Sequence, residues 1–327
     1  MKRCSSYPVR MTRITWYRPL VWLAGAMAVL AVASVIGAVV DGREVGGVNL
    51  WFKPLKFAIS VGIYCLSLAW VLELLGEKRR RLARIVGVVS VTGLVIEMVI
   101  IVGAAAAGLA SHFNVSTPLH AALWSIMAFS IVAVWVMALV VSLALFRTDL
   151  GDPARSLAIR AGAVLAVIGM GLAFLMTSPS AQQLADFQGI AGAHAVGVAD
   201  GGAGLPLLGW STVAGDLRIP HFVGMHALQV FPLLIVGIEL LSRRIGVLRH
   251  ARVRLNLVAI AIAAYAATIV LLTVQALSAQ SIVRPEGGVL VAGVAIAVAS
   301  IAAVCFVLYR ASTSVISGNA VEPARQA

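Results

Sequence analysis

The sequence predicts an all-α integral membrane protein, a bundle of eight transmembrane helices that forms one domain over residues 1–311. Two observations predict this fold. Of the 327 residues, 61% are hydrophobic and only 12% are charged, which does not fit a soluble domain. The apolar residues also occur in runs of about twenty, the length that crosses the hydrocarbon core of a bilayer.

Each apolar run is expected to form one helix. The runs cover residues 20–40, 55–75, 85–108, 119–146, 159–177, 220–241, 255–277 and 288–309. The loop at 178–219 is unusually long and rich in Gly and Ala, and loops of this length are commonly lids, binding loops or disordered segments. Its leucines and Trp210 favour a lid at the membrane interface. Residues 312–327 are expected to be a disordered cytoplasmic tail.

The positive charge is distributed as a topology signal. The net charge is +12, and all but five of the 25 Lys and Arg residues lie in alternate loops or at the ends of the chain. Because cytoplasmic loops carry an excess of Lys and Arg, both termini are predicted to be cytoplasmic and four loops to face outwards. The expected location is a bacterial cytoplasmic (plasma) membrane, with the lipid bilayer as partner and no nucleic acid.

This topology places five of the six histidines at or near the outer side: His112, His120, His194, His221 and His226. Pro220 suits the first position of a helix, so His221 is expected in the first turn. His226 then lies about 9 Å further in, at 1.5 Å per residue. Gln229 follows one turn later. Imidazole and amide groups inside an apolar helix are costly without partners, so they indicate a functional site.

Other polar residues are expected around these histidines. Glu97 is the only acidic residue close to the middle of a predicted helix, and it is the candidate catalytic proton carrier. Asn114, between His112 and His120, is a candidate polar partner, as is Gln229. Three basic residues on the outer side are candidates for binding an anion or a lipid headgroup: Lys53, Lys56 and Arg218. Lysines that snorkel at a helix end would give the same pattern.

Three chemistries fit this set of residues. The favoured one is haem b or transition-metal binding with a redox role, with ligands drawn from His226, His120, His112 and His221. Gly224 and Gly108 would leave room for a flat ring. His221 and His226 are five residues apart, about 140° around a helix, so they are not an i, i+4 chelate.

The second chemistry is a proton relay to a quinone through His226 and Glu97, and the third is binding of an anion or anionic lipid. Together they give the alternative function, a transporter or a lipid- or anion-processing protein whose His and Glu residues carry protons. A structural or assembly subunit is a further alternative. No nucleotide-binding, serine-hydrolase or metalloprotease motif is present to decide whether the protein is an enzyme.

Three short strings carry a resemblance to other proteins. They are Lys-Pro-Leu-Lys-Phe at 53–57, Ser-His-Phe-Asn at 111–114 and His-Phe-Val-Gly-Met-His-Ala-Leu-Gln at 221–229. These strings resemble those of uncharacterised bacterial multi-pass membrane proteins, over most of the chain. The resemblance implies a membrane fold and carries no catalytic role to any residue.

Overall fold

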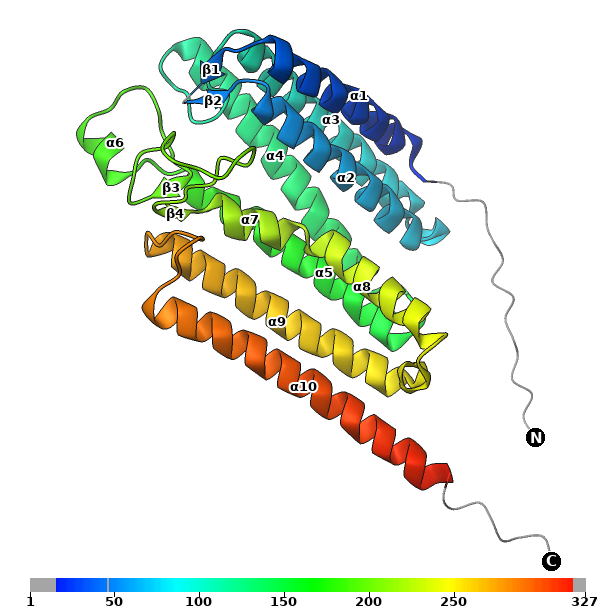
Figure 1. Ribbon diagram of the computed structural model, residues 1–327. Helices are drawn as coiled ribbons and strands as arrows, with labels where there is room; N and C mark the ends of the chain where they lie inside the picture. The colour runs from blue at the N-terminus through cyan, green and yellow to red at the C-terminus, as the bar shows by residue number, and fades with distance from the viewer. Residues whose placement is uncertain (1–15, 46, 320–327) are drawn as a thin grey trace, which may run out of the picture.

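The computed structural model describes residues 16–45 and 47–319, and its long helices run side by side (Figure 1). Those that form the body of the protein are α1 (Arg18–Val40), α2 (Phe52–Leu74), α3 (Arg80–Ala106), α4 (Pro118–Leu145), α5 (Pro153–Gly171), α7 (Arg218–Met225), α8 (Ala227–Ser242), α9 (Ala251–Leu277) and α10 (Gly287–Asn319). In the described part of the chain, seven helices are long and apolar enough to cross a membrane. The prediction of a helical membrane bundle is confirmed at this level.

The expected single helix over 220–241 is broken in two. α7 and α8 meet at His226 with a bend of 42°, and together they make an eighth span if the pair is counted as one. Pro232 lies inside α8 and has no N–H for the carbonyl of Leu228, which weakens the helix just after the bend. The break places His226 between two helix ends instead of inside a regular helix.

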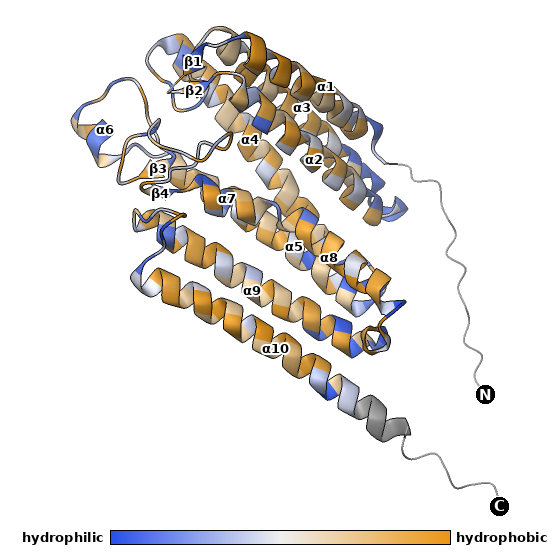
Figure 2. Ribbon diagram, viewed as in Figure 1, coloured by the Kyte–Doolittle hydropathy of each residue, from blue (hydrophilic) through white to orange (hydrophobic). Residues whose placement is uncertain are grey.

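Two hydrophobic cores hold the helices together. The larger joins α1, α2, α3 and α4, with contributions from α5, and the smaller joins α5, α8 and α9. α10 packs on α9 at the edge of the bundle and is mostly exposed. Orange, hydrophobic residues cover the outward faces of the helices, and the blue, hydrophilic residues gather at their ends (Figure 2). This surface fits a lipid environment.

Ion pairs and hydrogen bonds join the loops at one end of the bundle. Arg155 pairs with Glu239 at 2.9 Å, and Arg254 pairs with Asp152 at 2.8 Å. α1 begins and α10 ends at this same end (Figure 1). The basic residues Lys2, Arg3, Arg10 and Arg13 lie outside the described residues. α10 continues to Asn319, past residue 312 where the tail was expected to begin, and residues 320–327 are outside the described range.

The opposite end is covered by residues 172–217, which we call the lid. It contains η2 (Leu172–Met176), the short helix α6 (Ala181–Ala185) and strand β3 (Ala195–Val196), paired antiparallel with β4 (Gly215–Asp216). The N–H of Val115 donates to Gly189 O, and the N–H of Ala191 donates to Phe113 O, both at 2.8 Å. These bonds attach the lid to the α3–α4 loop and satisfy backbone groups that the lid would otherwise bury unpaired.

The remaining short elements lie in connecting loops. Strands β1 (Glu44–Val45) and β2 (Val48–Asn49) form a hairpin between α1 and α2. The 3-10 helices η1 (Glu77–Arg79) and η3 (Gly246–Arg249) precede α3 and α9.

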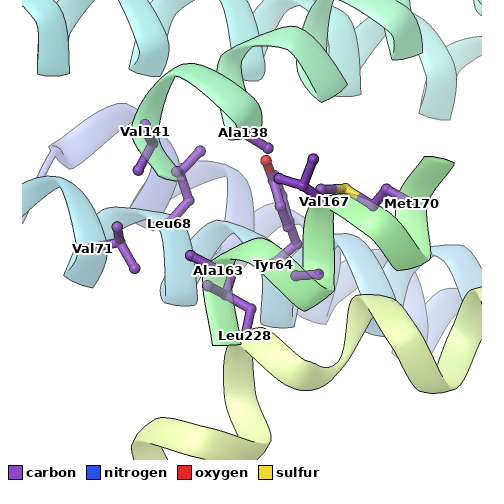
Figure 3. A pocket seen from close by; sticks show the side chains of 10 residues that line it. Tyr64, Leu68, Val71, Ala138, Val141, Ala163, Val167, Met170 and Leu228 are labelled. Atoms are coloured by element: carbon purple, nitrogen blue, oxygen red, sulfur yellow. The ribbon is translucent and has the colours of Figure 1, made fainter. Parts of the chain in front are cut away.

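A small apolar cavity lies where α2, α4, α5 and α8 meet (Figure 3). Its volume is about 20 Å³, close to the space that one water molecule needs. The hydroxyl of Tyr64 is buried there without a hydrogen-bond partner, near Ala138 and Val167. The cavity is far too small for a haem.

Candidate functional site

A group of polar side chains lies beneath and beside the lid, supplied by α2, α3, the α3–α4 loop, the lid and α7. We call it the outer polar cluster, and its members are Lys53, Glu97, His112, His194, Asp200, His221 and His226. Glu97 pairs with His112 and Asp200 with His194, and the charges of Lys53 and His221 interact with those of other members. These residues are far apart in the sequence, but in the folded chain they lie at the same end of the bundle.

Glu97 and His112 form the most buried part of this cluster. Glu97 is only 3% exposed, and its Oε1 lies 3.4 Å from His112 Nε2. The other oxygen of Glu97, Oε2, is buried and has no hydrogen-bond partner within the described part of the chain. Phe57 and Trp124 pack against the imidazole, with ring centroids 5.5 and 5.4 Å away. Burial, followed by the charges of Lys53 and His194, lowers the pKa of His112 well below its usual range.

The three candidate anion-binding residues have different surroundings. Lys56 donates from Nζ to Leu208 O at 2.9 Å, and Arg218 binds Gly209 O at 2.6 Å while it pairs with the buried Asp216. These two cations therefore hold the lid. Lys53 makes no hydrogen bond or ion pair within the described residues, although its charge interacts with that of Glu97. Unlike the other two cations, the ammonium of Lys53 is therefore available to bind another group.

His194 and Asp200 pair within the lid. His194 Nδ1 lies 2.7 Å from Asp200 Oδ2, and the backbone N–H groups of His194 and Ala195 donate to the same carboxylate. Burial raises the pKa of Asp200, but the hydrogen bonds outweigh it and bring the value to about 2. Asp200 is thus an anion that positions the imidazole. Burial lowers the pKa of His194 and favours its neutral form.

The two histidines of the broken helix each have one ring nitrogen engaged. His221 Nδ1 lies 2.8 Å from Gly169 O of α5, and His226 Nδ1 lies 3.1 Å from Gln229 Oε1. His226 Nε2 is buried, and no residue within 16–45 or 47–319 forms a hydrogen bond with it. Gln229 donates in turn to Ser67 Oγ of α2 at 2.8 Å. Gln229 therefore links His226 to Ser67 of α2.

His120 and Asn114 belong to a separate local network. Thr117 caps α4 by accepting from the N–H of His120, and Pro118 is the first helical residue. His120 Nδ1 contacts Ser116 Oγ at 3.1 Å, and the Ser116 hydroxyl donates to Asn114 Oδ1 at 2.7 Å. No contact in the described part of the chain joins His120 to the outer polar cluster.

The structure therefore regroups the predicted site residues. Glu97 lies beside His112, while His221 and His226 lie on the broken helix, and His120 remains at the edge. His194 and Asp200 were not among the site residues predicted from the sequence. The only signal for them was their place in an outer loop, because their pairing depends on a turn with no periodic pattern.

Compared with models of protein families, with curated proteins and with solved structures, the chain has no significant match. The function must therefore be argued from the site itself.

Proposed function

We propose that this is a multi-pass protein of a bacterial cytoplasmic membrane that moves or processes an anionic substrate at its outer side. Glu97 and His112 are its proton carriers, and Lys53 is the cation that receives the substrate. The single observation that carries the proposal is the buried carboxyl of Glu97. One oxygen lies beside His112, and the other has no hydrogen-bond partner among the residues that the structure describes. The charge of Lys53, which forms no side-chain hydrogen bond or ion pair with those residues, interacts with that of Glu97.

Proton exchange is the chemistry that these groups share. Intramembrane acidic groups commonly mark proton relays, and a neutral imidazole beside one can accept its proton. The 3.4 Å separation allows one proton to pass between Glu97 and His112 with a small movement. A bound anion at Lys53 would add negative charge near both groups and favour proton uptake. Substrate and proton binding would thereby be coupled.

The proposed topology has eight spans and both termini in the cytoplasm. The pair α7 and α8 counts as one span in this arrangement, which gives an even number of crossings. An even number agrees with α1 starting and α10 ending at the same end of the bundle (Figure 1). The loops at that end carry most of the basic residues, which favours a cytoplasmic side there. The lid and the outer polar cluster then face outwards.

The packing around Gly224 favours proton handling over haem-based redox chemistry. A methyl group added to Gly169 would lie 2.2 Å from the carbonyl carbon of Gly224, so the two backbones are already in contact. Gly224 thus lets α7 approach α5 and leaves no space for a flat ring beside it, whereas a methyl group added to Gly108 would meet nothing within 4 Å. A bare metal ion does not require such space.

Replacement of Glu97 by Gln is expected to remove one protonatable carboxyl from the interior of the protein. Infrared difference spectra between acidic and alkaline pH, recorded in lipid nanodiscs, should show a protonated-carboxyl band that Glu97→Gln lacks. Glu239→Gln is the matched control because Glu239 pairs with Arg155 at the opposite end of the bundle. This control should keep the band. Identical spectra for the wild type and Glu97→Gln would contradict the proposal.

A further inference from the structure

We infer that Phe113 is a positioning residue: its ring holds the His112 imidazole beside Glu97, and the lid holds Phe113. This role rests on the proposed function, and it adds to the proton carriers a residue that acts on Glu97 only through His112. Phe113 belongs to the Ser-His-Phe-Asn string at 111–114 and lies outside the helices and strands. Its conformation and its burial therefore need another explanation.

The backbone of Phe113 has a conformation that a bulky residue rarely adopts. Its φ is 62°, in the left-handed region, where the Cβ atom crowds the backbone. Strain of this kind persists only where the surroundings impose it, and it is concentrated at functional sites. Here the lid imposes it, because Phe113 O accepts from the N–H of Ala191 at 2.8 Å. Asn114, the next residue, forms an antiparallel bridge with Ile190 of the lid. The strained turn is thus fixed by its contacts with the lid.

This turn buries two neighbouring side chains together. Successive side chains of an extended chain point to opposite faces, yet Phe113 is 5% exposed and the His112 side chain only 16%. The Phe113 ring lies edge-on to the imidazole, with ring centroids 6.1 Å apart, and it also packs on Trp124 at 5.2 Å. Phe57 and Trp124 contact the imidazole as well. Three aromatic rings therefore fix its position.

The contact between His112 and Glu97 tolerates little displacement. His112 Nε2 lies 3.4 Å from Glu97 Oε1, whereas N–H···O hydrogen bonds are usually about 2.9 Å long. Proton transfer requires the two atoms to come within hydrogen-bond reach. If the imidazole moved away by a few tenths of an ångström, the pair would separate. Removal of a ring that packs on the imidazole is sufficient for such a shift.

The Phe113 ring also packs directly against the lid. The centroid of the His194 ring is 5.0 Å away. A methyl group added to Gly192 of the lid would lie 2.6 Å from Cδ1 of Phe113, closer than a Cβ atom can approach. Glycine at this position therefore allows the lid backbone to reach the ring. Phe113 thus joins the lid to the imidazole that lies beside Glu97.

The test uses the infrared band, recorded in lipid nanodiscs, that Glu97→Gln removes. The frequency of a protonated carboxyl depends on its hydrogen bonds, so His112→Ala gives the shift that follows loss of this partner. Phe113→Leu keeps an apolar side chain but no ring, and we expect it to produce most of the same shift. Met176→Ala is the control for lost packing, because Met176 is buried in the same apolar cluster as Phe113. This control should keep the wild-type band.

A second variant reaches the same ring from the lid. Gly192→Ala leaves Phe113 in place, but its methyl group would push on Cδ1, so the band should move towards its position in His112→Ala. Gly202→Ala is the matched control, because a methyl group there meets nothing within 4 Å. Where Phe113→Leu does not give a single peak on size exclusion, Gly192→Ala carries the test. A band that moves no further in Gly192→Ala than in Gly202→Ala would show that the lid does not hold the ring.

The other outcomes separate this role from the proposed function. The role of Phe113 is overturned if Phe113→Leu leaves the band unchanged while His112→Ala moves it. It is also overturned if Met176→Ala moves the band as far as Phe113→Leu does, since loss of packing alone would then explain the shift. A wild type without the Glu97 band, or a band that His112→Ala does not move, would contradict the proton exchange itself and this role with it.

Discussion

Gly169→Ala is expected to destabilise the protein at the upper end of the range for overpacking, about 3 kcal/mol or more. The added methyl would lie 2.2 Å from the carbonyl carbon of Gly224 and 2.3 Å from the nitrogen of Met225. Both atoms belong to the backbone, so no side chain can rotate away and α7 would have to separate from α5. Because Gly169 O accepts from His221 Nδ1 at 2.8 Å, the same shift would break this hydrogen bond as well.

The matched control is Gly25→Ala in the middle of α1, where an added methyl meets nothing within 4 Å. This change is expected to be neutral or slightly stabilising, since Ala favours a helix over Gly. Thermal unfolding in detergent, followed by the fraction of protein that stays monodisperse on size exclusion, would compare the two. Equal midpoints for Gly169→Ala and Gly25→Ala would show that the α5–α7 contact is not as close as described.

The helical bundle could be predicted from sequence because its cause is local. Any helix in contact with lipid needs an unbroken apolar run, and the run at 85–108, for example, corresponds to α3, Arg80–Ala106. The break at His226 was harder to foresee. Pro232 was visible, but whether a proline bends, ends or merely interrupts a helix depends on what packs beside it. Here α5 contacts α7 through Gly169.

The site was predictable only in outline. The predicted topology placed five histidines at one side of the membrane. That prediction needs only the orientation of each helix across the bilayer, considered separately. Which of them face each other depends on contacts between distant segments, such as Gly189 with Val115. The same contacts explain why Lys56 and Arg218 bind the lid while Lys53 does not. The spacing of residues along the sequence does not show which distant residues form such pairs.

Asp216→Ala is expected to destabilise the protein by about 3 kcal/mol, the low end for breaking a buried ion pair. Asp216 is 1% exposed, and it accepts from the Arg218 guanidinium and from the backbone N–H of Ser211 and of Arg218. The change leaves these donors unpaired in a buried loop. The low end applies because Arg218 is itself 27% exposed, so water can solvate part of the freed charge.

The structural consequence should be largest in the lid, because Asp216 lies in β4 opposite Ala195, the residue after His194. Limited proteolysis should therefore cut residues 178–214 faster in Asp216→Ala than in the wild type. Glu77→Ala is the control. Both side chains of the Glu77–Arg80 ion pair are exposed to solvent, so this pair should contribute little to stability. If Asp216→Ala kept the lid as resistant to protease as Glu77→Ala does, the Asp216–Arg218 pair could not be what holds the lid over the outer polar cluster.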